Sequence, residues 1–199
     1  MKYSGLNLAL QAFRNHQHWK PAWRNAEPSS AYDVIIIGGG GHGLGAAFYL
    51  AKHHGITRVA VLEKSWLGGG NTARNTMTIR DNYIYPDSAR FHRAALNAWR
   101  GLSEDINFNI MLSDRGMVSI LMSDRDLSDA RRMINTTALF GADHRIMNVD
   151  ALRHRLPIMR DSERFPVVGG IDHPEVKIAR HDAVAWGYAR AASKLGVDI

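Results

Sequence analysis

The stretch Tyr32–Ala47, YDVIIIGGGGHGLGAA, decides the fold. The β-branched run Val34–Ile37 predicts a buried central strand of a parallel sheet, because such strands are apolar on both faces. Gly38, Gly40 and Gly43 then follow with the spacing G-x-G-x-x-G. In this pattern the first glycine permits a tight turn and the second lets backbone N–H groups approach a pyrophosphate. The third lets the next helix pack closely against the strand.

A helix and a second strand follow this loop. Residues Leu44–Lys52 are predicted to form a helix whose positive N-terminal end faces the loop. The apolar strand Val59–Leu62 ends at Glu63, 25 residues after Gly38, where an acidic side chain binds a ribose in this type of fold. A glycine-rich turn without a ligand is the alternative, but the full order of elements favours a Rossmann-type nucleotide site. Because Glu63 would repel a 2′-phosphate, we expect FAD or NAD rather than NADP.

The composition is that of an ordinary globular protein of 199 residues, 45% hydrophobic and 22% charged. The absence of cysteine excludes disulfides, thiolate metal sites and a cysteine nucleophile. The net charge is +6, but the arginines are scattered rather than gathered in one tract, so we expect no nucleic-acid partner. No apolar run reaches the roughly 18 residues that span a bilayer, and no signal-peptide core is present. We therefore expect a cytoplasmic protein without a membrane partner.

Residues 1–31 are predicted to form an N-terminal arm. Its apolar positions that would line one face of a short helix are Leu6, Leu10 and Phe13. His16 and His18 lack a third ligand, so we predict no metal site. The segment Trp19–Trp23 is expected to be extended, with its tryptophans buried against another subunit.

A polar segment, Lys64–Arg80, follows Glu63 (KSWLGGGNTARNTMTIR). Gly68–Gly70 is a second flexible loop, and a dense polar cluster comes next: Asn71, Thr72, Arg74, Asn75 and Thr76. This cluster is either a solvated loop or a source of donors to phosphates and to a flavin ring. Arg80 suits a bidentate clamp on a carboxylate, with a structural ion pair as the alternative.

Residues 82–165 interrupt the βαβ pattern of residues 32–81, as an inserted α+β substrate domain would. The predicted elements are a helix capped by Asp87 and running to about Arg100, strands at Asn107–Leu112 and Gly116–Met122, a helix over Asp126–Phe140 closed by Gly141, a strand at Arg145–Met147 and a helix over Val149–Arg155 capped by Asn148. The predicted buried face of the first helix is Phe91, Ala94, Ala95, Ala98 and Trp99.

Residues 166–199 are expected to return to the nucleotide-binding domain. They contain a strand at Val167–Ile171, a helix over Ala183–Lys194 and the start of a strand at Val197. A parallel sheet with a third strand cut short is too small to be complete, so we expect the N-terminal part of a longer polypeptide. The predicted fold class is α/β: a Rossmann-type FAD-binding domain with an inserted α+β substrate-domain segment, truncated at the C-terminus. His181 precedes the last helix; it is either a partly exposed cap or a nucleophile that attaches a cofactor.

Several stretches together resemble the beta subunits of heterotetrameric sarcosine oxidases, in the glycine oxidase and D-amino-acid oxidase class of flavoenzymes. They are the glycine loop within Val34–Ala47, Glu63, the loop Gly68–Arg80 (GGGNTARNTMTIR) and the segment Ala179–Ala191 (ARHDAVAWGYARA). The glycine loop is common to many proteins, whereas the last two segments are far more specific. The resemblance runs from about Tyr32 to Ile199 and is weaker over residues 82–164.

This resemblance implies FAD bound non-covalently in the Rossmann site and FMN bound covalently through His181, rather than His173, at the interface with the alpha subunit. It implies that Arg80 holds the substrate carboxylate and that Tyr83 lies in the same pocket. The implied flavin-binding residues are Gly38, Gly40, Gly41, His42, Gly43, Glu63, Asn71, Arg74, Asn75, Thr76, Met77, Arg80, His181 and Val197.

The implied reaction is the oxidative demethylation of sarcosine to glycine. The methyl group leaves as formaldehyde, or as methylenetetrahydrofolate on the alpha subunit, and electrons pass from FAD to FMN and then to oxygen, giving hydrogen peroxide. The implied partners are alpha, gamma and delta subunits, with tetrahydrofolate and NAD on the alpha subunit. Because the C-terminal half of the family's flavin and substrate sites is absent, we expect the 199-residue chain to be inactive by itself.

The sequence is also compatible with two other functions. One is another FAD-dependent amine or imino-acid dehydrogenase, of the dimethylglycine or proline type. The other is a non-catalytic assembly subunit whose nucleotide only stabilises it. The dense polar loop that ends in Arg80 favours an enzyme.

Overall fold

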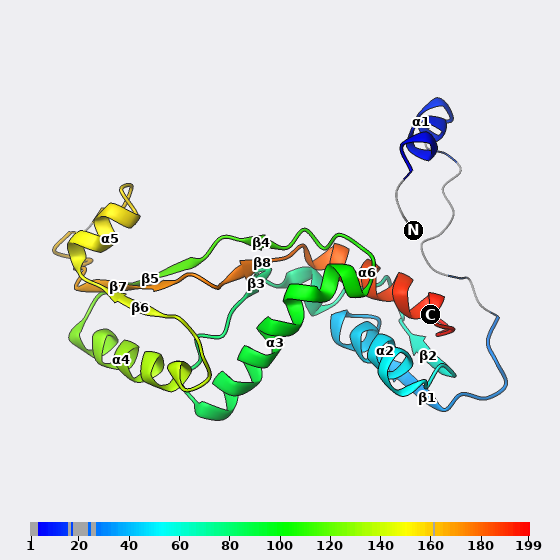
Figure 1. Ribbon diagram of the computed structural model, residues 1–199, viewed down its shortest axis with the longest axis horizontal. Coiled ribbons are helices and arrows are strands. Elements are labelled where there is room, and N and C mark those ends of the chain that lie inside the picture. The colour runs from blue at the N-terminus through cyan, green and yellow to red at the C-terminus, as the bar shows by residue number, and fades with distance from the viewer. Residues whose placement is uncertain (1–3, 16, 18–23, 25–26, 161) are drawn as a thin grey trace. The chain divides into compact units, whose positions relative to one another are not determined.

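The computed structural model describes residues 4–15, 17, 24, 27–160 and 162–199 (Figure 1). The predictions made for His16, His18 and the segment Trp19–Trp23 lie outside the described residues. The chain divides into two compact units. Unit 1 comprises residues 1–75, 103–110 and 180–199, and unit 2 comprises residues 76–102 and 111–179. Among the described residues, no helix combines the length and the apolar character needed to cross a membrane.

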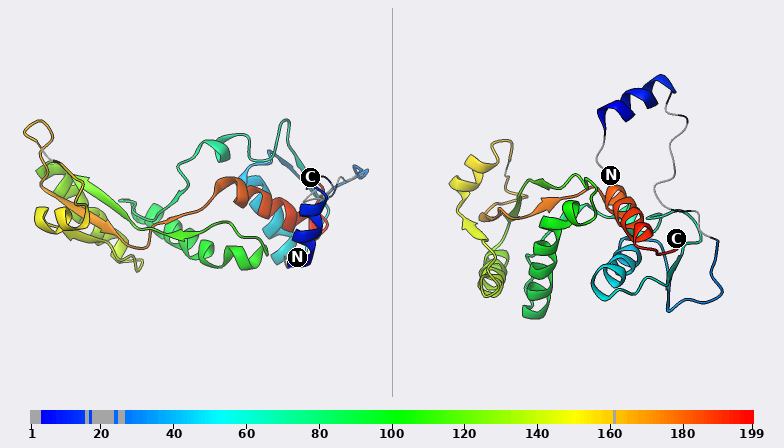
Figure 2. Two further views of the ribbon diagram at one scale, coloured as in Figure 1. Left: turned by 90° about the horizontal axis from the view of Figure 1, so that it is seen from above. Right: turned by 45° about the vertical axis from the view of Figure 1, so that its right-hand side comes forward.

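Unit 1 is built on the predicted βαβ pattern. Strand β1 (Val34–Ile37) pairs in parallel with β2 (Val59–Leu62), from Val34 opposite Val59 to Ile37 opposite Leu62. Helix α2 (Gly41–His54) connects them, and α6 (His181–Lys194) packs beside α2 (Figure 2). After α6, Asp198 forms a parallel bridge with Ala60 of β2. The predicted third parallel strand thus begins beside β2.

The prediction that β1 is buried on both faces is wrong for the described chain. Ile35 and Ile37 are 58% and 89% exposed, whereas Val34 and Ile36 are half-buried. Helices α2 and α6 pack against each other, and nothing in the described part of the chain covers the face that carries Ile35 and Ile37. Helix α2 also begins three residues earlier than predicted, at Gly41, and ends before Gly55, which has the positive φ of 66° typical of a C-terminal cap. At the N-terminus, α1 (Gly5–Phe13) forms as predicted.

Unit 2 contains two antiparallel sheets. In the larger sheet, β7 (Gly169–His173) lies between β5 (Met117–Leu121) and β6 (Arg145–Met147). Helices α4 (Asp124–Ala138) and α5 (Val149–Arg155) contact this sheet. One apolar cluster of this unit contains the buried residues Leu121, Ala130, Met133 and Ile171. The predicted strand β6, helix α5 and the Asn148 cap, whose side chain accepts from the Ala151 N–H, are confirmed.

The smaller sheet of unit 2 places β8 (Lys177–Ile178) between β3 (Thr78–Ile79) and β4 (Ser113–Asp114). Residues Asn107–Leu112 were predicted as a strand, but Asn107 and Met111 have φ values of 47° and 55°, which no regular strand accommodates. Strand β4 instead falls between the predicted strands Asn107–Leu112 and Gly116–Met122. Strand β7 begins two residues later than predicted, at Gly169.

Helix α3 (Pro86–Asp105) extends beyond its predicted end, and Asp87 lies inside its first turn rather than at its cap. Its predicted buried face is also wrong. The buried residues are Ala89, Leu96 and Leu102, whereas Phe91 is 69% exposed. More than one set of apolar residues on α3 recurs with the period of a helix. The packing of the folded protein buries a different set from the predicted one.

The two units also divide the chain at other positions than the boundaries expected at residues 81 and 165. Unit 2 begins at Thr76 and ends at Ala179, and residues 103–110 between these limits belong to unit 1. The difference arises from strand pairing. Strands β7 and β8 lie in the part of the chain expected to rejoin the nucleotide-binding domain, but they are the central strands of the two antiparallel sheets of unit 2.

Candidate functional site

The glycine loop after β1 has the geometry that its sequence pattern predicts. Gly38 has a φ of 108°, a conformation that residues with a side chain rarely adopt. At Gly43, an added Cβ would lie 2.1 Å from the Gly38 carbonyl oxygen. Helix α2 therefore approaches the end of β1 as closely as a backbone can, with Gly40 as its N-cap. The first N–H groups of a helix have no partner within it, so this end can bind an anion.

Glu63, predicted to bind a ribose, braces this loop. Its Oε2 accepts a hydrogen bond from the Gly39 N–H at 2.8 Å, and its Oε1 accepts one from the Ser65 N–H at 3.0 Å. A carboxylate has about four lone-pair directions, so capacity remains for two hydroxyl donors. The two bonds fix the carboxylate at the tip of β2, and its contact with a ribose stays a prediction.

An open pocket of about 410 Å³ lies at the carboxyl ends of β1 and β2, where ligands bind in open α/β sheets. Its lining residues are Ile37, Val61, Leu62, Glu63, Lys64 and Ile199. Val197, a predicted cofactor contact, is fully buried in unit 1, so only its backbone can reach a ligand.

The second loop holds the first in place. Thr72 Oγ1 accepts from the Gly41 N–H at 2.9 Å, and Arg74 Nη1 donates to the carbonyls of Gly69 and Gly70 at 2.6 and 2.9 Å. Asn75 Nδ2 donates to the Thr72 carbonyl at 2.6 Å. Sequence reasoning placed Thr72 in a polar cluster but did not identify this contact between the loops, since nothing local in the sequence points to it.

Four of the predicted flavin-binding residues are exposed to solvent. His42, Asn71 and Asn75 are exposed in unit 1, as is Thr76 at the start of unit 2. Met77 is exposed, has a φ of 60°, and its carbonyl accepts from the Ala179 N–H at 3.1 Å. The cofactor contacts of these residues stay predictions.

Arg80 and Tyr83, predicted to bind the substrate, lie together in unit 2. The Arg80 guanidinium carbon is 4.9 Å from the centre of the Tyr83 ring, and Arg80 Nη1 donates to Asn82 Oδ1 at 3.0 Å. Tyr83 stacks on His92, with ring centres 3.8 Å apart. Burial, together with the nearby Arg80 charge, lowers the pKa of His92, so this ring is neutral at pH 7.

Arg80 has no carboxylate partner among the described residues, unlike many other arginines of the chain. The alternative of a structural ion pair is therefore not seen in the described structure. Its side chain is exposed, so the guanidinium is free to receive an external carboxylate.

His181 is the first residue of α6, and its Nδ1 is buried with no hydrogen-bond partner among the described residues. The neighbours that could have oriented its ring are engaged elsewhere: Arg180 donates to both carboxylate oxygens of Asp182, and this pairing lowers the pKa of Asp182. An unpaired ring nitrogen is a potential nucleophile.

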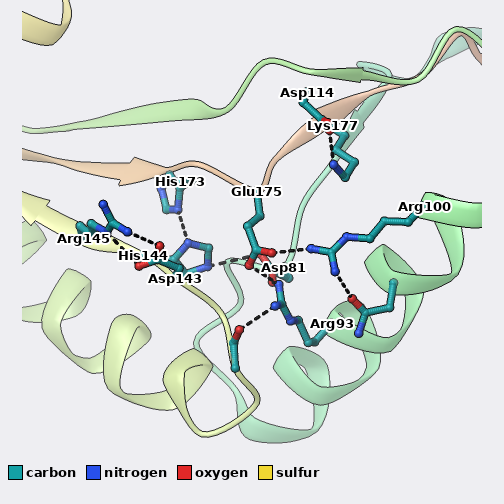
Figure 3. A network of polar contacts seen from close by, with 12 residues as sticks. Asp81, Arg93, Arg100, Asp114, Asp143, His144, Arg145, His173, Glu175 and Lys177 are labelled. Atoms are coloured by element: carbon teal, nitrogen blue, oxygen red, sulfur yellow. Dashed lines mark hydrogen bonds and ion pairs between the residues drawn. The ribbon is translucent and has the colours of Figure 1, made fainter.

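A buried polar network in unit 2 escaped the sequence analysis (Figure 3). Asp81 contacts both Arg93 and His144, and His144 in turn contacts His173. Burial, reinforced by the neighbouring His144, lowers the pKa of His173 to about 4. The members of this network come from distant parts of the chain, and no spacing rule links them. The sequence singles out His173 only as the alternative to His181 for flavin attachment.

The fold and the glycine loop define a Rossmann-type dinucleotide-binding protein. The profile of the family described as FAD dependent oxidoreductase (DAO) matches residues 33–199, so the chain belongs to this family, and the predicted α/β class is confirmed. The chain is 47% identical over its whole length to sarcosine oxidase subunit beta of Rhizobium meliloti, of which it covers 48%. It is 43% identical to the protein of the same name from Rhodobacter capsulatus, with the same coverage of both chains.

Among solved structures, L-amino acid deaminase from Proteus myxofaciens matches 89% of this chain and 39% of its own, with 26% identity and a TM-score of 0.78. The resemblance predicted from the sequence is thus confirmed. The chain spans about half the length of the curated relatives that it matches.

Replacing Gly43 by Ala is expected to weaken FAD binding by about tenfold or more, because the new methyl group would force the loop away from the Gly38 carbonyl. Titration of the flavin-free protein with FAD, followed by flavin fluorescence, measures this affinity. Gly101→Ala is the matched control, since nothing lies within 4 Å of a Cβ there. Equal affinity for both variants would contradict the proposed close approach.

The low pKa of His173 makes the stability of unit 2 depend on pH. A histidine with a pKa of about 4 in the folded protein and 6.5 when unfolded takes up a proton on unfolding, so the free energy of unfolding falls as the pH is lowered between these values. The expected loss between pH 7 and pH 5 is about 2 kcal/mol. Asp81, whose pKa is also lowered, adds to this loss only below its ordinary pKa of 3.8.

Urea unfolding at both pH values, followed by hydrogen exchange of β7 amides, measures this loss. His173→Asn should remove most of the pH dependence, whereas His154→Asn, at an exposed position on α5, should keep it. An undiminished dependence in His173→Asn would rule out this assignment.

Proposed function

We propose that the chain provides the FAD-binding and carboxylate-binding parts of a sarcosine oxidase beta subunit, which oxidises sarcosine to glycine in the cytoplasm. The main support for this proposal is that the chain is 47% identical over its whole length to a protein named sarcosine oxidase subunit beta. The glycine loop, the braced Glu63 and an arginine without a described carboxylate partner supply groups that such a reaction needs.

FAD fits the residues of unit 1. Because Gly43 has no Cβ, α2 packs against the Gly38 carbonyl and its N-terminus lies at the glycine loop, where it favours the negative charge of a pyrophosphate. Glu63 is fixed at the tip of β2 to accept ribose hydroxyls. When bound, FAD supplies the acceptor for the hydride that leaves the N-methyl carbon of the substrate.

Substrate binding is assigned to Arg80 and Tyr83. The exposed guanidinium binds the sarcosine carboxylate through two parallel hydrogen bonds, and the Tyr83 ring beneath it limits the directions that Arg80 can take. Fixing the carboxylate orients the N-methyl group and removes part of the entropic barrier, on the order of several kcal/mol in favourable cases. The amine must be neutral for its C–H bond to give up a hydride.

A second flavin is assigned to His181, as an FMN attached covalently to its ring. The support is that His181 Nδ1 has no described hydrogen-bond partner. This atom is buried, so attachment of the flavin there requires the ring to rotate and bring Nδ1 to the surface. In this proposal the chain assembles with alpha, gamma and delta subunits, and tetrahydrofolate and NAD bind to the alpha subunit. The name "subunit beta" of the relatives supports assembly with other chains.

Arg80→Ala in the full-length oxidase is expected to raise the KM for sarcosine by about 100-fold, since a charge-assisted bidentate pair contributes about 2–3 kcal/mol. Steady-state kinetics with sarcosine, dimethylglycine and proline measures this and separates the related amine dehydrogenases. Arg90→Ala, at an exposed position on α3, should leave KM within about twofold. An unchanged KM for Arg80→Ala would exclude the clamp.

Mass spectrometry of the peptide that contains His181, isolated from the assembled oxidase, is expected to show a covalent flavin mononucleotide. His181→Ala should lose the adduct, whereas His53→Ala, an exposed histidine on α2, should retain it. An unmodified His181 peptide would refute the assignment of FMN while leaving the FAD site intact.

A further inference from the structure

The substrate-binding segment is anchored by one fully buried side chain. Asp81 is 1% exposed, although it stands between the exposed Arg80 and the half-buried Asn82. Asp81 directly follows Arg80, so the burial of Asp81 restricts the backbone that carries the exposed Arg80 side chain. A buried carboxylate is strongly unfavourable unless it is paired, so the partners of Asp81 are needed to hold it there.

The side chains of Arg93 and His144 hold Asp81 in place. Arg93 of α3 donates to Oδ2 at 3.0 Å, and His144 Nε2 lies 3.3 Å from Oδ1. Burial alone would raise the pKa of Asp81, but His144 and Arg93 more than offset this and hold the pKa below its usual range. The carboxylate is therefore ionised at pH 7 and acts as a charged anchor.

The partners of Asp81 are themselves fixed. Arg93 also donates to Glu175 Oε2 at 2.5 Å and to the Gly141 carbonyl at 2.6 Å. His144 Nδ1 lies 3.1 Å from Nδ1 of His173, a side chain with no exposed surface. Arg93 therefore cannot follow Asp81 if the Arg80–Tyr83 segment shifts, and a displacement would leave buried groups unpaired.

The other end of this chain of contacts is Ser119 on β5, whose Oγ lies 3.0 Å from His173 Nε2. The contacts therefore run from Ser119 through His173 and His144 to Asp81, where His144 Nε2 lies 3.3 Å from Asp81 Oδ1. The larger sheet of unit 2 thus supports the anchor through Ser119 on β5 and His173 on β7. Figure 3 shows His173 next to His144, and His144 next to Asp81.

The backbone transmits this anchoring to the substrate-binding side chains. The Tyr83 N–H donates to the Asp81 carbonyl at 2.9 Å, which closes a tight turn immediately after Arg80. We propose that Asp81, held by Arg93 and His144, is a positioning residue that fixes the direction of Arg80 and Tyr83 and so sets the affinity for the substrate carboxylate. This inference rests on the proposed role of Arg80.

The test is a double-mutant cycle in the full-length oxidase with its partner subunits, using Arg80→Ala, Asp81→Asn and both together. Asp81→Asn is expected to raise the KM for sarcosine about tenfold with kcat within about twofold. In the Arg80→Ala background the same change should alter KM by less than about twofold, because no clamp remains to be positioned. Asp143→Asn, an exposed carboxylate that pairs with Arg145, is the matched control and should leave KM unchanged.

Each outcome decides the matter. Equal effects of Asp81→Asn with and without Arg80, or a lower melting temperature with unchanged KM, would overturn the positioning role and leave only a structural one. If Arg80→Ala itself leaves KM unchanged, the proposed function of Arg80 fails first. If Asp81→Asn does not assemble, His144→Gln replaces it in the cycle, with an expected rise of about threefold that Arg80→Ala abolishes; an additive effect would overturn the inference.

Discussion

The close approach of α2 to the end of β1 is the constraint on which the nucleotide site depends. It exists because Gly43 has no Cβ to meet the Gly38 carbonyl oxygen. With the helix N-terminus held there, partial positive charge gathers at the ends of the parallel strands. Glu63 and Thr72 then fix the loop from two sides through the N–H groups of Gly39 and Gly41. Binding of an anion by backbone groups needs this rigidity, since a mobile loop would lose entropy on binding.

In unit 2, the arrangement of the chain around Arg80 depends on buried polar side chains rather than on close backbone packing. Beside its buried apolar residues, unit 2 contains a network of polar side chains that includes the buried Asp81, His144 and His173 (Figure 3). Buried charges of this kind add little net stability compared with apolar packing, but removing one partner leaves another unpaired. Such a network therefore specifies one arrangement of the chain. In this protein the specified arrangement includes the turn at Asp81 and hence the exposed Arg80.

The contrast among arginines clarifies why Arg80 stands out. Arg93 and Arg100 both bind Glu175, and Arg180 binds Asp182 in a bidentate pair. Each of these groups has its charge compensated within the protein. Arg80 contacts an amide oxygen and an aromatic face, neither of which neutralises it. A guanidinium in this state gains most from an added carboxylate, which agrees with the function that similarity to sarcosine oxidase beta subunits supports.

The sequence by itself determined the nucleotide-binding core, because strand, glycine loop, helix and acidic residue follow one another locally and each carries its own signal. It also placed Arg80 and Tyr83 close together, three residues apart. Only the tertiary structure decided which stripe of α3 is buried and which groups pair around Asp81. His144 and His173 are 29 residues apart, and Arg93 and Glu175 are 82 apart. Contacts at such separations arise from antiparallel pairing around β7, and no local preference of the chain encodes that pairing.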